Sequence, residues 1–286
     1  MANNSSSAVN VGDVGILAYC VSMETGMYIW GIGSIICCAA GLPANFVILW
    51  EMFKAYRDGA ALTSYNLFLL NLSSMDTVFL LFLPVAIINH FKLNIWLLNA
   101  FSSATYTLNI CGRPLLMACI CLDLYVAVVH PIFYRRMKSL TPRAVGVAVV
   151  WFVTLITAGF YFSFNELYFT LFSTLYFIAA MVIIGICDAF ILYVLIASGR
   201  SGRGVHPQKQ RAIHTLTNSL VMTFISYFPP VVLFIFGLHL MSDSRVFICT
   251  VGLPITLTST WGSAVMPMLH LNDLGKFNCL WVRCAQ

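Results

Sequence analysis

The chain has 286 residues, of which 60% are hydrophobic and only 9% are charged, with a formal net charge of +5. A soluble domain carries about 25% charged residues, so this composition cannot supply a water-facing surface. We therefore exclude a soluble enzyme, a nucleic-acid-binding protein and a disordered chain, and expect a membrane protein whose main partner is the lipid bilayer.

Residues 1–26 are predicted to be an extracellular N-terminus and not a signal peptide. The opening sequence MANNSSSAVN has neither the basic segment nor the apolar core of a cleaved signal. Asn3 and Asn4 each begin an N-x-S sequence, the acceptor for N-glycosylation. Glycosylation there would place this end outside the cell.

Seven apolar runs follow, and each is long enough to cross a bilayer. A membrane-spanning helix needs about 20 apolar residues, and its backbone groups must pair within the segment. The runs cover roughly 27–50, 64–88, 100–129, 143–163, 171–197, 211–238 and 246–270. The expected fold is an all-α membrane protein, a seven-transmembrane helix bundle over 27–270, with a short cytoplasmic amphipathic helix and tail over 271–286.

The basic residues alternate between loops and thereby predict the orientation. Of the 15 Lys and Arg, twelve lie in the tail or in the loops after runs one, three and five, two lie in the opposite loops, and Arg113 lies inside a run. Loops rich in Lys and Arg remain in the cytoplasm. We therefore expect a multi-pass plasma-membrane protein with its N-terminus outside.

The end of the third run carries a specific motif. Residues 122–134 read LDLYVAVVHPIFY, which resembles the D-R-Y-x-A-V-x-x-P-L-x-Y that ends helix three of rhodopsin-like (class A) G-protein-coupled receptors. Similar motifs occur at 41–45 (GLPAN), 71–76 (NLSSMD) and 224–230 (FISYFPP), and at Pro267. The resemblance implies a receptor for an extracellular ligand that signals to a heterotrimeric G protein. It implies no enzymatic activity, and we expect no cofactor and no metal.

The resemblance also assigns switching and coupling positions. These are Asp123, Leu124, Tyr125, Phe224, Phe228, Pro230, Pro267 and His270. Leu124 stands where the family has Arg, and Met266 and His270 stand where it has the Asn and Tyr of N-P-x-x-Y. A seven-helix decoy or partner receptor that does not couple therefore remains an alternative. A transporter is a weaker one, because the chain has no internal repeat.

A ligand cavity is expected at the extracellular ends of runs three, five, six and seven. The candidate ligand-binding residues are His90, Tyr106, Thr107, Ile110, Phe177, Met181, Val231, Ile235, Thr256 and Thr260. They are apolar to mildly polar, and Tyr106 stands where receptors for amines have an acidic residue. His90, His239 and Arg245 lie near the expected rim, either as ordinary loop residues or as a basic rim that attracts an anion. We expect an unknown small-molecule ligand, lipid-like or anionic.

Four ionisable residues lie within the apolar runs, namely Asp76, Arg113, Asp123 and Asp188. A charge inside a span costs about 2.5–3.5 kcal/mol and needs a partner or water. Asp76 and Arg113 both lie near mid-depth, so we predict that they form an intramembrane ion pair. In the family the position of Asp76 helps to hold a sodium ion, and the resemblance implies that the Arg113 guanidinium replaces it.

The surroundings of these charges prompt three further expectations. Pro114 should kink the third helix, because it lacks a backbone donor, and Asn109 or neighbouring Ser and Thr side chains could bond the freed carbonyl group. Asp123 is expected to pair with Arg135, Arg136 or solvent. Asp188 has no evident partner and is expected to face a wet bundle interior.

The cysteines suggest one disulfide bond and a lipid anchor. Cysteines within the apolar runs are interpreted as small buried hydrophobic residues. Cys20 and Cys249 lie outside those runs on the predicted extracellular side and are candidates for a bridge between the N-terminus and the seventh helix. Cys279 and Cys284 lie beside the membrane in the tail and are candidates for palmitoylation.

Overall fold

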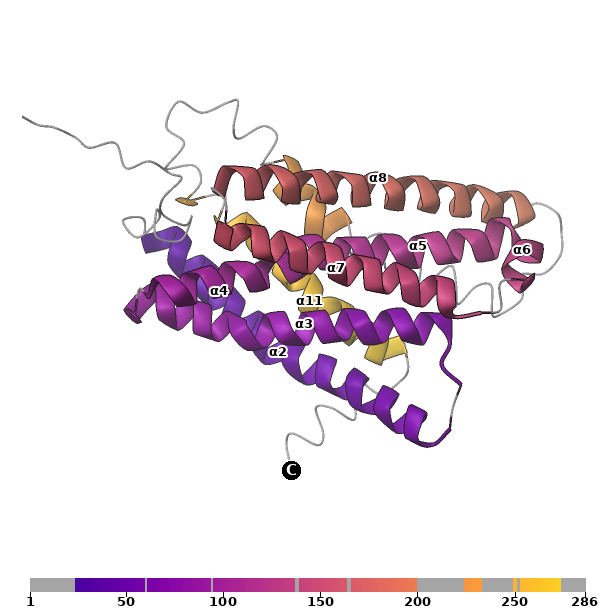
Figure 1. Ribbon diagram of the computed structural model, residues 1–286, viewed down its shortest axis with the longest axis horizontal. Helices are drawn as coiled ribbons and strands as arrows, with labels where there is room; N and C mark the ends of the chain where they lie inside the picture. Colours follow the sequence, from indigo (N-terminus) through magenta and orange to yellow (C-terminus); the bar gives the residue numbers. More distant parts are fainter. Residues whose placement is uncertain are drawn as a thin grey trace, which may run out of the picture.

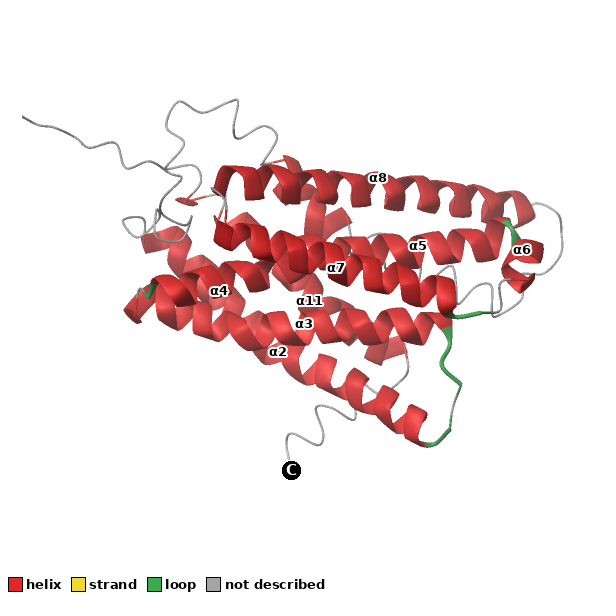
Figure 2. Cartoon of the chain, viewed as in Figure 1, coloured by secondary structure: helices red, strands yellow, loops and turns green. Residues whose placement is uncertain are grey.

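The structure is a computed structural model, and it describes residues 24–59, 61–93, 95–136, 139–163, 166–199, 224–232, 249–250 and 253–273. Within these ranges all regular secondary structure is helical, as Figure 2 shows. The prediction of an all-α membrane fold is confirmed. In Figure 1 the long helices lie side by side along a common direction and form a bundle.

The predicted runs reappear as helices with similar bounds. Five of them are single long helices: α2 (Glu24–Arg57), α3 (Ser64–Ile88), α7 (Thr141–Ser163), α8 (Glu166–Gly199) and α11 (Leu253–Asp273). Residues 224–232 form the described part of run six. Helix α3 begins where run two was predicted to begin, because the Thr63 side chain caps it by accepting a hydrogen bond from the Asn66 backbone N–H at 3.2 Å.

The third run is divided into three segments and flanked by two short helices. It consists of α4 (Trp96–Thr107), the π-helical turn η2 (Leu108–Gly112) and α5 (Arg113–Val129). The π-helical turn η1 (Asn89–Leu93) precedes it and the short helix α6 (Pro131–Arg136) follows it. Pro114 lies two residues after the end of η2, and a proline that removes a backbone donor is a usual cause of such an irregularity. The irregularity expected at Pro114 therefore takes the form of a π-helical turn.

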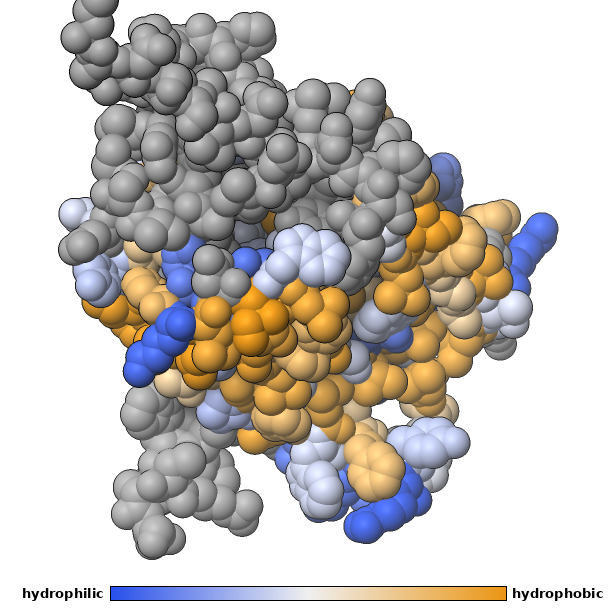
Figure 3. Space-filling view, turned by 60° about the vertical axis from the view of Figure 1, so that its left-hand side comes forward, coloured by the Kyte–Doolittle hydropathy of each residue, from blue (hydrophilic) through white to orange (hydrophobic). Residues whose placement is uncertain are grey.

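Five stretches of the described residues are long and apolar enough to cross a membrane. They are Thr25–Arg57, Ser64–Leu93, Trp96–Val129, Thr141–Phe160 and Leu175–Val194. Large apolar side chains point outward from them, such as Trp50, Phe152 and Tyr193, which are 64%, 65% and 71% exposed. Figure 3 shows this broad hydrophobic surface in orange. An outward-facing apolar surface of this kind suits lipid as its solvent.

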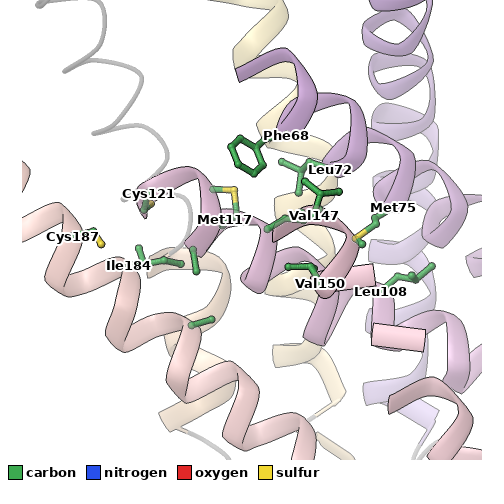
Figure 4. Close-up of a cluster of buried hydrophobic side chains, with 13 residues drawn as sticks. Phe68, Leu72, Met75, Leu108, Met117, Cys121, Val147, Val150, Ile184 and Cys187 are labelled. Atoms are coloured by element: carbon green, nitrogen blue, oxygen red, sulfur yellow. The ribbon is translucent and has the colours of Figure 1, made fainter. Parts of the chain in front are cut away.

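The largest buried cluster joins four helices and the π-helical turn around the middle of the bundle. Its members come from α3, η2, α5, α7 and α8, and ten of them are labelled in Figure 4. A second cluster joins α2, α3 and α11, with Trp30 only 1% exposed at its centre. The polar residues described next lie on helices that both clusters hold in place.

Candidate functional site

Asp76 and Arg113 face each other inside the bundle, on α3 and at the first position of α5. Their side chains are 2% and 3% exposed, and Arg113 Nε lies 3.7 Å from Asp76 Oδ1. This distance is too long for a hydrogen bond. The two charges attract across the gap, but they make no direct hydrogen bond to each other.

Ser263 and Gly262 of α11 connect the two charges. Arg113 Nη1 donates to Ser263 Oγ at 3.0 Å, and Arg113 Nη2 donates to the Gly262 carbonyl at 2.6 Å. Ser263 Oγ in turn donates to Asp76 Oδ1 at 2.7 Å. The hydroxyl group therefore bridges guanidinium and carboxylate, and the three helices α3, α5 and α11 meet at one polar cluster, which we call the core cluster.

Pro267 explains why α11 has a backbone acceptor to spare at this point. A proline has no N–H, so the carbonyl group four residues earlier, at Ser263, loses its helical partner. Asn45 of α2 fills that vacancy: its Nδ2 donates to the Ser263 carbonyl at 3.1 Å and to the Gly41 carbonyl at 3.0 Å. A fourth helix is thereby attached to the core cluster.

Several buried polar atoms of the core cluster make no hydrogen bond in the described structure. They are Asp76 Oδ2, Arg113 Nε, Asn109 Nδ2, Asn45 Oδ1 and the hydroxyl group of Tyr227. Asn109 Oδ1 lies 3.4 Å from Ser263 Oγ. Since Asn109 Nδ2 has no partner among the described residues, Asn109 is not the one of the expected donors that bonds a carbonyl group freed by Pro114.

A second ion pair lies at the end of the bundle that carries α6, and we call it the end cluster. Arg143 Nε donates to Asp123 Oδ1 at 2.5 Å, and the Tyr134 hydroxyl group donates to Asp123 Oδ2 at 3.3 Å. The Arg143 guanidinium also lies 4.8 Å from the centre of the Tyr134 ring. Asp123 therefore has a partner that the sequence did not suggest beside the expected Arg135, Arg136 and solvent, because α7 delivers Arg143 to it from the neighbouring helix.

The other predicted switch residues are distributed along the same helices. Leu124 and Tyr125 are half-buried on α5, and the Tyr125 ring lies edge-on to Phe190 of α8. Phe224 and Phe228 stack on each other with centroids 4.5 Å apart, and both are exposed. Beside them Pro230 is half-buried.

The seventh run contains the last two switch positions, Pro267 and His270. Pro267 is buried in α11. His270 Nδ1 lies 3.2 Å from the hydroxyl group of Tyr65, at the start of α3. His270 therefore links α11 to α3 at the same end of the bundle as the end cluster.

The predicted ligand residues are placed on the expected helices, but they are mostly packed. Tyr106 lies edge-on to Phe79 at 5.2 Å, and Phe177 lies edge-on to Tyr227 at 5.1 Å. Thr107 and Thr260 are buried, and the others are half-buried, namely His90, Ile110, Met181, Val231 and Thr256. Ile235, together with His239 and Arg245 of the predicted rim, lies outside the described residues.

The structure tests the remaining predictions only in part. Cys249 is disulfide-bonded, and its predicted partner Cys20 lies outside the described residues, as do Asn3, Asn4, Cys279 and Cys284. Six cysteines within the described helices are free thiols. Asp188 is 2% exposed on α8, and neither carboxylate oxygen makes a hydrogen bond to the described part of the chain.

Four contributors to these clusters were missed by reasoning from the sequence: Gly262, Ser263, Arg143 and Tyr134. A signal existed for Ser263, because Pro267 lies four residues after it and frees its carbonyl group. Arg143 was used only as one of the basic residues that predict the orientation in the membrane. Its contact with Asp123 depends on how α7 packs on α5, which no local pattern states.

With this geometry in place, the comparison with protein families locates the similarity in the stretch from α2 to the start of α8. Residues 44–169 match the family described as 7 transmembrane receptor (rhodopsin family). This stretch contains Asp76, Arg113 and the whole end cluster. It ends before α11, which contributes Gly262 and Ser263 to the core cluster.

Individual relatives are receptors of several kinds. The chain is 29% identical to chemerin-like receptor 2 of Homo sapiens over 145 residues, which are 48% of this chain and 39% of that receptor. It is 32% identical to C-C chemokine receptor type 6 of Mus musculus over 137 residues, 46% of this chain and 36% of the receptor. Lysophosphatidic acid receptor 5 of Bos taurus is 29% identical over 126 residues, 42% of this chain and 33% of the receptor. The matched segment thus spans less than half of each relative.

Proposed function

We propose that the chain, whose residues 44–169 match the rhodopsin-like receptor family, is a divergent class A seven-transmembrane receptor that binds an extracellular ligand and signals to a G protein. The positive-inside distribution of Lys and Arg supports an N-terminus outside the cell. An accessibility tag at each end of the chain tests the orientation: only the N-terminal tag should be labelled on intact cells.

One observation carries the proposal beyond family membership. A single helix, α5, begins with Arg113 in the core cluster and reaches Asp123 in the end cluster. The two residues are separated by about 15 Å along the helix, at about 1.5 Å per residue. A ligand that shifts α5 or α11 near the extracellular side would therefore displace groups at the cytoplasmic side, which is what transmembrane signalling requires.

The ligand we propose is a small molecule with an apolar body and an anionic group. The expected cavity residues are aromatic, aliphatic or hydroxylated, with His90 at their edge. One relative is by name a receptor for lysophosphatidic acid, which is an anionic lipid. The test is a thermal-stability screen of the purified receptor against lysophospholipids, fatty acids and nucleotides. A ligand that binds the folded state raises Tm, and the rise grows with the logarithm of the ligand concentration above Kd.

The Asp76–Arg113 pair supports a second part of the proposal, namely independence from sodium ions. The guanidinium already neutralises the carboxylate that holds the ion in relatives, and it cannot diffuse away. The wild-type receptor should show the same Tm and the same ligand affinity in sodium and in N-methylglucamine buffers. A sodium-dependent shift in either quantity would refute this part of the proposal.

A receptor that binds ligand without coupling is the second candidate, and one observation favours it. Leu124 replaces the arginine that the family carries beside Asp123, and Arg143 occupies Asp123 instead. The two candidates differ in nucleotide exchange on purified G proteins. Exchange by the wild-type receptor supports coupling. Exchange only by Leu124→Arg, with none by the wild type, supports the non-coupling receptor.

A further inference from the structure

Gly262 is the point at which the Arg113 side chain meets the backbone of α11. A Cβ atom at this position would lie 2.6 Å from Arg113 Nη1 and 2.9 Å from Ser226 Oγ. Both distances are well inside van der Waals contact. The guanidinium cannot simply move aside, because it is buried and bonded to the Gly262 carbonyl and to Ser263 Oγ.

A glycine in the middle of a helix needs a reason, since it is about 1 kcal/mol less favourable there than alanine. Other glycines of the bundle provide a comparison: at Gly146, Gly159 and Gly185 a Cβ atom would meet nothing within 4 Å. Gly262 is different because two polar side chains from two other helices occupy the space that its side chain would take. The absence of a side chain at Gly262 leaves the space that the Arg113 guanidinium occupies.

Residues 224–232 of run six also contact Gly262. Ser226 Oγ lies over Gly262, and the Ser226 carbonyl accepts a hydrogen bond from the Thr258 hydroxyl group at 3.0 Å. The Arg113 guanidinium and the Ser226 hydroxyl group therefore both lie against Gly262 of α11, with Asp76 of α3 beyond Ser263. Any sliding of α11 relative to α5 must break the two hydrogen bonds from Arg113.

We propose that Gly262 and Arg113 form a latch that fixes α11 to α5 and α3 in the resting receptor. Gly262 is the positioning residue, because its lack of a side chain leaves room for the Arg113 guanidinium, which makes the hydrogen bonds to α11. A diffusible ion would hold the helices only in proportion to its concentration, whereas a tethered guanidinium is always present. The hydrogen bonds of Arg113 therefore stabilise the resting state to the same extent at every ion concentration. A ligand activates the receptor only if it binds the active state more tightly than the resting state by enough to offset that stabilisation. Only the signalling consequence of the latch rests on the proposed function.

The test is a double-mutant cycle on the full chain in detergent micelles, with Tm as the first readout. The variants are Gly262→Ala, Arg113→Ser and the two together, with Gly146→Ala as the matched control for glycine replacement in an open helix position. Gly262→Ala should lower Tm by roughly 5 °C or more, as expected when a buried charge loses its partners. In the Arg113→Ser background the same change should lower Tm by less than half as much, and Gly146→Ala should not lower it at all.

Two results would overturn the latch: an equal fall for Gly262→Ala in both backgrounds, or a fall no larger than that of Gly146→Ala. If Gly262→Ala does not fold well enough for purification, surface expression of the same variants in cells replaces Tm. A smaller fractional loss of surface expression for Gly262→Ala in the Arg113→Ser background than in the wild-type background then supports the latch, and an equal fractional loss in both backgrounds rejects it.

Basal nucleotide exchange is the second readout and separates the latch from the proposed function. Release of the latch should raise basal exchange at least about twofold in Arg113→Ser and Gly262→Ala, because the resting state loses stabilisation. Unchanged exchange in a receptor that does couple refutes the resting-state role. No exchange by any variant counts against the proposed function, and the Tm cycle then decides the latch alone.

Discussion

The molecule contains two arginine–aspartate pairs that differ in an instructive way. In the end cluster, Arg143 and Asp123 are in direct contact at 2.5 Å, with side chains 9% and 20% exposed. In the core cluster, Arg113 and Asp76 are 3.7 Å apart and 3% and 2% exposed. We expect the longer pair to matter far more for stability, because a charge left alone in the core cannot recruit water as a charge at the bundle end can. For these two pairs, the extent of burial and not the distance between the charges should therefore decide the effect on the free energy of unfolding.

The largest expected effect comes from breaking the core pair on one side. Arg113→Leu should reduce the free energy of unfolding by about 3–5 kcal/mol, because Asp76 is left as a buried, unpaired charge. Adding Asp76→Leu should recover part of that loss. Tm in micelles and surface expression measure both steps. If the double variant is no more stable than the single variant, the two residues are not energetically coupled.

Ser263→Ala should have the next largest effect. It removes the hydroxyl group that accepts from Arg113 and donates to Asp76, and the free energy of unfolding should fall by about 1–3 kcal/mol. Ser259→Ala on the same helix is a suitable control, because within the described part of the chain the Ser259 hydroxyl group bonds its own helix, at the Thr256 carbonyl. Equal Tm values for the two variants would contradict a bridging role for Ser263.

Arg143→Ala should reduce stability by about 1 kcal/mol or less, since the end pair is partly solvated. Its effect should also shrink as salt is added, because mobile ions screen partly exposed charges. The measurement is the Tm difference from the wild type at low and at high salt. The same comparison for Arg113→Leu should show no salt dependence. A salt-sensitive core pair would remove the contrast between the two clusters.

Tyr134→Phe should produce the smallest change, a few tenths of a kcal/mol. It removes the 3.3 Å hydrogen bond to Asp123 and keeps the ring that lies against the Arg143 guanidinium. Tyr134→Ala removes both contacts and should be the more destabilising of the two. If the two variants unfold at the same temperature, the ring contributes nothing to the end cluster.

The fold could be predicted from the sequence because lipid leaves few choices. Apolar runs of membrane-spanning length must be helices, and the predicted bounds of run two, 64–88, coincide with α3. The meeting of Asp76 and Arg113 was also predictable, because each charge lies at mid-depth and has few possible partners there. The distribution of charge among the loops gave the orientation, which the tag experiment tests.

Other features depend on packing that the sequence does not state. The partner of Asp123 was predicted among its chain neighbours, yet Arg143 reaches it from α7 across a helix interface. No sequence pattern marks Gly262, because its importance depends on the Arg113 guanidinium that packs against it from another helix. The predicted cavity residues were assigned from family positions, and the packing of Tyr106 on Phe79 and of Phe177 on Tyr227 was not foreseen.

The π-helical turn Leu108–Gly112 affects how the outer half of the third helix should be numbered. A turn of this kind accommodates one residue more than an α-helical turn, and one residue corresponds to a rotation of about 100°. Counting upward from Asp123 in steps of 3.6 residues therefore assigns the wrong face to residues beyond the turn. A chemist who docks molecules against this protein should take the orientation of Tyr106 from its own neighbours and not from its alignment column.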